Sequence, residues 1–433
     1  MAPDRQTADD GAPPRKSAIA AWCLYDWANS SIVTVVLTFV FAVYFAKGVS
    51  ADEIAATHDW GMMLAASGVA VALLSVVLGP IADKTGRRKP WLLAATVVAV
   101  ACGMALWWIE KDPAYVPAAL LLVAALNVAF EIGTLFYNAM LPDVAPARML
   151  GRISGWGWGL GYVGGIACLL LALPFVLGET APFGLDKATG EHVRATCVLA
   201  AAWYLVFAIP LFLFVPDRPG TGMGMGAAAL EGLREVAGTV RLLRAHPNLL
   251  RFLVARTLYQ DGLNTLFAFG GIYAAGTVGM NETQIIAFGI LMNVMAGAGA
   301  FAFAWLDDRM GSRRTVLAAL AGLLGFGLPV LLTDGVTAFY VFGLGLAIFI
   351  GPAQAASRTF MARLTPPGHE AQMFGLFNLT GKAISPLGPL VFGTATALFA
   401  SQRAGMATIL LFFAAGFAVL WFVREPGLER GGR

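Results

Sequence analysis

The feature that most constrains this chain is a succession of apolar runs, each long enough to cross a lipid bilayer. A membrane-spanning helix needs about 20 predominantly apolar residues. The 433-residue sequence offers twelve such runs. Their approximate limits are 18–46, 60–82, 91–110, 115–138, 152–178, 196–215, 249–275, 283–305, 315–333, 336–361, 371–398 and 405–423. Because lipid offers a backbone no hydrogen-bond partners, each run is predicted to be a helix, giving an all-α integral membrane protein.

The composition supports this class and excludes several others. Hydrophobic residues make up 58% of the chain and charged residues 13%, against about 25% charged residues in soluble domains. The net charge of +3 is too small for a nucleic-acid partner. The four cysteines have no metal-ligand or CxxC spacing, and the sequence lacks HExxH, P-loop and GxSxG motifs. We therefore expect no enzyme activity, no metal and no cofactor.

The loops between the runs alternate in charge. One side collects the basic residues Arg15, Lys16, Lys84, Arg87, Arg88, Lys89, Arg148, Arg152, Arg218, Arg234, Arg241, Arg244, Arg251, Arg309, Arg313, Arg314, Arg363 and Arg424. The other carries Lys47, Lys111, Lys187, Arg194 and Arg403. Basic loops mark the cytoplasmic side, so we expect both termini in the cytoplasm of a bacterial cell with the chain in its inner membrane.

The longest internal hydrophilic stretch, 216–248, divides the runs into two sets of six and contains a predicted amphipathic helix. The predicted organisation, in full, is a disordered cytoplasmic tail at 1–16, a six-helix bundle at 17–215, the cytoplasmic linker at 216–248, a second six-helix bundle at 249–424 and a tail at 425–433.

The two halves repeat each other at three places in the same order. DKTGRRK at 83–89 matches DRMGSRR at 308–314, and LPDVAPARMLG at 141–151 matches TPPGHEAQMFG at 365–375. YDWAN in the first run is echoed by YQDGLN in the seventh. Parallel halves of six spans are the plan of a large class of transporters whose substrate binds near the membrane midplane between the halves.

The string GPIADKTGRRKPW at 79–91 resembles the loop between spans two and three of the major facilitator superfamily. Within it, WCLYDWANSS, YNAMLPDVAP and QAASRTFMARLTPPGHEAQMFGLF look like the vacuole-effluxer-like branch, which includes fungal amino-acid exporters. The resemblance implies two pseudo-symmetric six-helix bundles that transport a small solute by alternating access. Two family features are missing: Tyr162 replaces the proline of the span-five antiporter motif, and span four carries Glu131 where many proton-linked members carry arginine.

Asp26 is a carboxylate inside the first apolar run, where a charge costs about 2.5–3.5 kcal/mol on insertion scales. Asn29 lies one helical turn later on the same face, and Trp22 and Tyr25 lie close before Asp26 in the sequence. These residues predict either a substrate or proton site with an aromatic wall, or an interhelical hydrogen bond near the cytoplasmic end of the span.

Other ionisable groups fall inside spans four, seven and eleven: Glu131, Arg256, Asp261 and Lys382. Asn264 follows Asp261 as Asn29 follows Asp26. A mixed set of charges suits a zwitterion, with carboxylates for an ammonium group and Arg or Lys for a carboxylate. It equally suits a salt-bridge network that holds one conformation closed.

The repeated loops are interpreted as a cytoplasmic gate made of Asp83, Gly86, Arg87, Arg88, Asp308, Gly311, Arg313 and Arg314. The resemblance implies that Asp83 caps or pairs with a neighbouring helix end while the bases pair with acids or lipid headgroups. The alternative is that the bases only set topology.

Span five contains Gly157, Gly161 and Gly165 at intervals of four, a pattern that predicts close helix packing. Its overlap with a dinucleotide-binding fingerprint is discounted because no strand precedes it.

The sequence thus predicts a monomeric secondary transporter of a small polar solute, an amino acid among the candidates, with a coupling proton or cation. The alternatives are a non-transporting receptor or scaffold of the same fold and a sugar or drug carrier.

Overall fold

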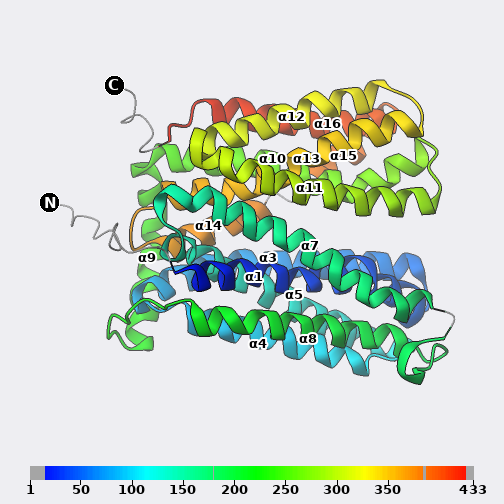
Figure 1. Cartoon of the computed structure of the whole chain (residues 1–433), viewed down its shortest axis with the longest axis horizontal. Coiled ribbons are helices and arrows are strands. Elements are labelled where there is room, and N and C mark those ends of the chain that lie inside the picture. Colours follow the sequence, from blue (N-terminus) through cyan, green and yellow to red (C-terminus); the bar gives the residue numbers. More distant parts are fainter. Residues whose placement is uncertain (1–14, 179, 384–386, 426–433) are drawn as a thin grey trace.

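The computed structural model describes residues 15–178, 180–383 and 387–425, and all of its regular secondary structure there is helical. The helices form two bundles that lie side by side with their axes roughly parallel (Figure 1). This confirms the predicted all-α fold of two helical bundles.

The first bundle is built from long helices joined by short turns. Its elements are α1 (Lys16–Ser31), α2 (Phe41–Tyr44), α3 (Glu53–Thr85), α4 (Lys89–Ala105), α5 (Val116–Ala139), α6 (Leu141–Val144), α7 (Leu150–Leu177) and α8 (Glu191–Phe214). Short 3₁₀ turns occur at Leu106–Trp108, Pro113–Tyr115, Ala147–Met149 and Pro182–Gly184.

The second bundle follows a linker that contains the helix α9 (Met225–Ala245). Its elements are α10 (Pro247–Gly276), α11 (Glu282–Met310), α12 (Ser312–Leu332), α13 (Val336–Leu364), α14 (Glu370–Ala383), α15 (Leu387–Leu398) and α16 (Gln402–Trp421). The run predicted over 371–398 is helical on both sides of residues 384–386, which lie outside the described part, and the two described pieces are α14 and α15.

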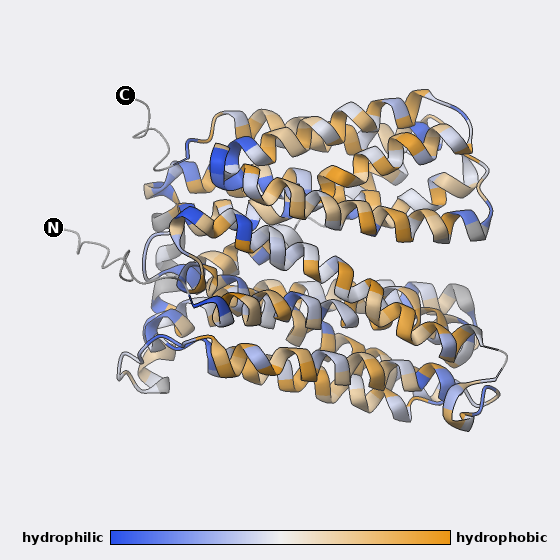
Figure 2. Cartoon of the chain, in the orientation of Figure 1, coloured by the Kyte–Doolittle hydropathy of each residue, from blue (hydrophilic) through white to orange (hydrophobic). Residues whose placement is uncertain are grey.

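Among the described residues, ten helical segments are long and apolar enough to cross a membrane. The α10 helix and the α14–α15 pair fill the remaining places in the second bundle (Figure 1). Hydrophobic residues cover the middle of the bundles and hydrophilic residues gather at their ends (Figure 2). We call the end where α1 begins and α16 finishes the basic end, because Arg88, Arg152, Arg218, Arg313 and Arg363 lie there.

The first span does not remain a regular α-helix. After α1 the chain continues as a π-helix over Ile32–Phe39, then as α2, and then as a second π-helical turn over Phe45–Val49. The first π segment is rich in β-branched residues, which fit an α-helix less readily. Such wider turns are often found at functional sites, and this one carries Thr34, Thr38 and Phe39 into the cavity between the bundles.

The glycines of α7 let two neighbouring helices approach it closely. A methyl group at Gly165 would lie 2.5 Å from the Thr34 hydroxyl, and one at Gly161 would lie 3.0 Å from the Ser30 hydroxyl. On another face, a methyl group at Gly155 would lie 2.6 Å from the Ala304 Cβ atom of α11. The α7 helix is therefore packed tightly against α1 of its own bundle and α11 of the other.

Candidate functional site

A cavity of about 700 Å³ lies between the two bundles. The bundles meet at the basic end, where α14 packs on α3 and α7 packs on α11 and α13. Toward the opposite end α7 and α11 diverge (Figure 1). The lining of the first span runs from Asp26 to Phe39, away from the basic end. The structure is thus closed at the basic end and hollow beyond it.

The walls of this cavity differ in chemistry. The first bundle contributes most of the polar lining, namely Asp26, Asn29, Ser30, Thr34, Thr38, Thr134, Trp158 and Tyr162. The second bundle contributes Asn293 and Gln354 among otherwise apolar or glycine lining residues. Such a cavity suits a solute with a polar or charged group at one side and an apolar part at the other.

Asp26, on the cavity floor, forms an ion pair with Arg358 of α13. The Arg358 Nη1 atom lies 2.9 Å from the Asp26 Oδ2 atom. The same guanidinium donates from Nε to the Ser154 hydroxyl at 2.9 Å and from Nη2 to the Ser154 carbonyl at 2.6 Å. It also donates to the Asn138 side chain at 3.3 Å. Arg358 therefore bonds to three helices of the opposite bundle: α1, α5 and α7.

Aromatic rings enclose the same guanidinium. Its carbon atom lies 4.8 Å from the Trp22 ring centre, 5.6 Å from that of Tyr137 and 4.9 Å from that of Trp158. Trp22 stacks on Tyr137 with 4.3 Å between ring centres. Cation–π contacts strengthen when water is excluded, and only 1% of the Arg358 side chain is exposed. The rings hold the cation while the carboxylate neutralises it.

Gln354, one turn before Arg358, makes a second contact between the bundles. Its side-chain oxygen accepts hydrogen bonds from Trp158 Nε1 at 3.1 Å and from the Tyr162 hydroxyl at 2.8 Å. All three residues line the cavity. Tyr162, at the position where the antiporter motif has proline, thus takes part in a polar contact between the bundles.

Other predicted site residues near Asp26 lie outside the cavity lining. Tyr25 is fully buried in the first bundle, where its hydroxyl bonds to the hydroxyls of Thr96 and Tyr204 at 2.8 and 2.7 Å. Trp22 is fully buried as well and donates to the Tyr137 carbonyl at 3.2 Å. Of this group, Asp26 and Asn29 reach the cavity.

Arg256 belongs to a second polar cluster between the bundles. It donates to the Phe377 carbonyl at 2.6 Å and the Thr380 hydroxyl at 3.1 Å, and its guanidinium carbon lies 3.3 Å from the Phe377 ring centre. Glu131 of α5 interacts electrostatically with Arg256. The Asn378 side chain donates to the Glu131 carbonyl at 3.2 Å. This cluster joins α5 to α10 and α14 outside the described cavity lining.

Asp261 and Asn264 are likewise absent from the described lining. Asp261 is 3% exposed, and its Oδ2 atom accepts from the Gly388 N–H of α15 at 2.8 Å. Its Oδ1 atom has no hydrogen-bond partner among the residues that the structure describes. Asn264 accepts from Gln260 of its own helix at 3.0 Å. The side chain of Lys382 falls outside the described residues.

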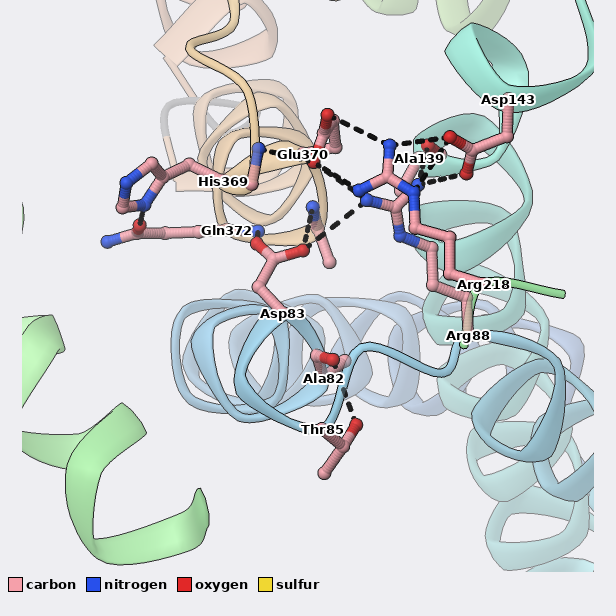
Figure 3. Close-up of polar contacts among 12 residues, drawn as sticks. Ala82, Asp83, Thr85, Arg88, Ala139, Asp143, Arg218, His369, Glu370 and Gln372 are labelled. Atoms are coloured by element: carbon pink, nitrogen blue, oxygen red, sulfur yellow. Dashed lines mark hydrogen bonds and ion pairs between the residues drawn. The ribbon is translucent and has the colours of Figure 1, made fainter. Parts of the chain in front are cut away.

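Two aspartates close the basic end in pseudo-symmetric positions. Asp83, near the end of α3, accepts from the backbone N–H groups of Ala371 and Gln372 at 3.0 and 2.8 Å (Figure 3). These donors begin α14 of the other bundle, and a carboxylate is stabilised at a helix N-terminus. The matching residue, Asp308 of α11, accepts from the N–H groups of Gly151 and Arg152 at 2.8 and 3.2 Å, where α7 begins.

Charged side chains reinforce the α3–α14 contact. Arg88 lies 2.6 Å from Asp143, 2.8 Å from Glu370 and 3.6 Å from Asp83 (Figure 3). Arg218 of the linker binds both Asp143 and Glu370. Burial lowers the pKa of Arg218, but the hydrogen bond to Glu370 and the charges of Asp143 and Glu370 outweigh it and raise that pKa above its ordinary value. Glu370 of the second bundle is thus bound both by Arg88 of the first bundle and by Arg218 of the linker.

The α7–α11 contact has its own charges. The Arg152 Nε atom lies 2.7 Å from the Asp308 carboxylate. Arg363, at the end of α13, lies 3.4 Å from Asp307 and 2.7 Å from Glu425. Glu425 also accepts from the N–H groups of Ser312 and Arg313 at 3.0 and 2.9 Å.

The remaining predicted gate residues are two glycines in turns and three arginines. Gly86 and Gly311 have φ of 76° and 90°, in the left-handed region that favours glycine. A methyl group at Gly86 would also lie 2.8 Å from the Pro219 carbonyl. Arg313 donates to the Trp421 carbonyl, while Arg87 and Arg314 are exposed.

Sequence reasoning missed Arg358, Asp143, Glu370, Arg218 and Glu425. Arg358 lies in QAASRTFMARL, the polar end of the tenth apolar run, so an arginine inside a membrane span was the available signal. Glu370 and Arg218 fall outside the predicted apolar runs, and a charge between runs gives no signal until its partner in the other bundle is known.

The family model described as "Vacuole effluxer Atg22 like" matches residues 61–150 and 143–430. The MFS-type transporter YxiO of Bacillus subtilis (strain 168) is 25% identical over 411 residues, covering 94% of each chain. Autophagy-related protein 22 of Coccidioides immitis (strain RS) is 27% identical over 285 residues, which are 60% of this chain and 46% of the fungal protein. The chain thus spans about half the length of this fungal relative.

Two solved structures share the fold. The proton:xylose symporter XylE gives a TM-score of 0.71 at 13% identity, covering 94% of this chain and 96% of that one. The Escherichia coli fucose:proton symporter FucP gives 0.70 at 14% identity, with 94% and 98% covered. At these identities the likeness shows the fold alone.

Proposed function

Because the chain belongs to the vacuole effluxer Atg22-like family of major facilitator transporters, we propose that it is a secondary active transporter of a small polar solute, with amino acids as the substrate class. It works by alternating access, in which the cavity between the bundles opens to one side of the membrane at a time. The observation that carries this proposal is the ion pair at the cavity floor between Asp26 of the first bundle and Arg358 of the second.

The basic end is cytoplasmic in this proposal, since loops rich in Lys and Arg are retained on the cytoplasmic side. The structure then represents an outward-facing state of a bacterial inner-membrane protein. To face inward, the protein must break the two aspartate–helix contacts and the bonds of Arg358 to the first bundle. Asp83 and Asp308 are accordingly proposed as gate residues.

The cavity chemistry supports a zwitterionic substrate with an apolar side chain. Asp26 presents a carboxylate to an ammonium group at the polar wall. In this state Arg358 is buried outside the described cavity lining. It becomes available to the substrate carboxylate only after the ammonium group has displaced it from Asp26, and a guanidinium can then bind a carboxylate through two parallel bonds. The apolar lining of α10, α11 and α16 would then contact the side chain of the solute.

The same exchange couples binding to opening. In the ion pair Asp26 holds α13 against α1, and an ammonium group that takes over Asp26 weakens that hold. Only a ligand that binds one state better than the other can shift the equilibrium between them. A solute that competes for Asp26 meets this requirement, because it removes the Asp26–Arg358 ion pair, which stabilises the state with the basic end closed.

The test is solute flux through the full-length protein in liposomes. We expect counterflow of at least one neutral amino acid, and accumulation that depends on an imposed pH or sodium gradient if transport is ion-coupled. The Asp26→Asn variant should lose flux, whereas the control Asp59→Asn, a partly exposed carboxylate on α3 outside the cavity lining, should retain it.

The alternatives give distinct outcomes. Flux of pentoses or hexoses without flux of amino acids would favour a sugar carrier. Ligand-dependent thermal stabilisation without flux of any solute would favour a receptor that kept the fold. Either result overturns the proposed substrate class, and the second overturns transport itself.

A further inference from the structure

We infer that Arg218 of the linker is a working part of the gate: it latches the linker to both bundles and holds the basic end closed. This inference rests on the alternating-access function proposed above. It assigns to residues 216–221 a role beyond connecting the two bundles.

Arg218 contacts both sides of the junction at once. Its Nε atom lies 2.8 Å from Asp143, at the α6 helix of the first bundle. Its Nη1 and Nη2 atoms each lie 3.0 Å from an oxygen of Glu370, where α14 of the second bundle begins. A guanidinium that engages a carboxylate through two N–H groups is among the stronger and more directional polar contacts in proteins.

The neighbouring linker residues fix the position of that guanidinium. Asp217 accepts from the Arg88 N–H at 3.0 Å, where α4 begins. The Thr221 N–H donates to the Thr85 carbonyl at 3.1 Å, and its hydroxyl donates to the Lys84 carbonyl at 2.6 Å. The segment before α9 is therefore bonded on both sides of Arg218 to the end of α3, near Asp83, and to the start of α4. In this state, residues 217–221 are held in place by hydrogen bonds to the first bundle.

The segment after α16 repeats the arrangement in the second bundle. Glu425 accepts from the N–H groups that begin α12, as Asp217 does for α4, and it binds Arg363. In both bundles, residues just past the sixth span thus complete the polar contacts of the basic end. The two arrangements differ in one respect: Arg218 reaches across to Glu370 of the other bundle, whereas Glu425 and Arg363 belong to the same bundle.

The latch predicts a specific energetic effect. Opening the basic end separates Glu370 from Asp143, so Arg218 must release at least one of them. Loss of Arg218 therefore favours the inward-facing state without touching the cavity. Arg88 retains its own contacts with Asp143 and Glu370, so the closed state is weakened and not abolished.

The experiment measures conformation directly, with the full-length protein in lipid nanodiscs. A reporter thiol is placed by Asn293→Cys, because Asn293 lines the cavity and its side chain bonds only within its own helix in the described structure, to Gly289 at 2.8 Å. Protein without the reporter gives the background of the native cysteines, of which Cys23, Cys168 and Cys197 are buried. The readout is the rate of alkylation by a polar maleimide.

Adding Arg218→Gln should slow this alkylation about threefold or more, the change expected once roughly a third of the molecules or fewer face outward. Arg234→Gln, an exposed arginine of α9, is the matched control and should leave the rate unchanged. Arg218→Glu, which places a third carboxylate between Asp143 and Glu370, should slow alkylation at least as much as Arg218→Gln.

Equal rates in the parent, Arg218→Gln and Arg234→Gln proteins would overturn the inference and leave the linker as a passive connection. If Arg218→Gln does not fold, Arg218→Lys, which keeps the charge but loses the paired N–H geometry, should show a smaller slowing, and an unchanged rate would overturn the inference. The assay needs no substrate, so it separates failure of the latch from failure of the proposed transport function.

Discussion

Arg358 and Asp26 lie 332 positions apart in the chain, on helices of opposite bundles, and their side chains meet at 2.9 Å. The two partners are not equivalent. Arg358 is almost completely buried among aromatic rings, whereas Asp26 also lines the cavity. One partner can therefore be reached by a solute or by water, while the other depends on the protein for its neutralisation.

This asymmetry predicts different costs for removing either partner. Asp26→Asn leaves a buried guanidinium without its carboxylate, and breaking a buried ion pair in this way costs about 3–5 kcal/mol. Arg358→Met leaves a carboxylate that cavity water can solvate, so we expect a smaller loss of stability. Thermal unfolding in detergent should rank the variants in that order, with Asp26→Asn/Arg358→Met more stable than Asp26→Asn alone. A reversed ranking would show that Arg358 is solvated by some other route.

The sequence was enough to predict the fold and to single out Asp26, because apolar length, loop charge and the internal repeat are properties of the chain itself. It was not enough to predict the partner of Asp26. Nothing in the sequence indicates that Arg358, in the tenth run, crosses to the first bundle, since that depends on how α7 and α13 pack. Arg256, Asp261 and Glu131 illustrate the same limit: each is a charge inside a span, yet the structure places them outside the cavity lining.

Asp83→Ala should slow transport more than it weakens substrate binding. The substitution removes two hydrogen bonds from the α14 N-terminus to a carboxylate, each worth about 1.5–3 kcal/mol, and these bonds exist only while the basic end is closed. The substrate cavity is left intact. Counterflow kinetics should show a lower turnover with a nearly unchanged KM. Asp83→Asn keeps an oxygen that can accept one N–H and should fall between Asp83→Ala and the parent. A raised KM at normal turnover would instead place Asp83 in the binding of substrate.

Gly157→Ala tests whether the close approach of α7 to α1 matters for the ion pair. A methyl group at Gly157 would lie 2.8 Å from the Asp26 Oδ2 atom and 3.2 Å from Arg358 Nη2, so one of these groups must move. Overpacking of this kind costs about 1–3 kcal/mol. We expect lower thermal stability and weaker substrate binding. Gly68→Ala is the control, because a methyl group there has no neighbour within 4 Å and alanine favours the helix. Equal behaviour of the two variants would mean that α7 adjusts without disturbing Asp26.

Asp261→Asn should abolish transport driven by a pH gradient while leaving the fold intact, if Asp261 carries a coupling proton. The structure allows a sharp test because, among the described residues, the two carboxylate oxygens are bonded differently. Oδ2 accepts from the Gly388 N–H, which an asparagine oxygen can also do, whereas the buried Oδ1 atom has no hydrogen-bond partner in that part of the chain. An unpaired buried charge is destabilising, so replacing the carboxylate by a neutral amide should leave the melting temperature unchanged or raise it. Flux driven by a pH gradient should be lost, and exchange of solute at equal pH should persist.

Two outcomes would contradict this role. Gradient-driven flux at the parent rate would assign Asp261 to helix packing at the start of α15. Loss of both activities together with a lowered melting temperature would show that the ionised carboxylate is needed for the fold.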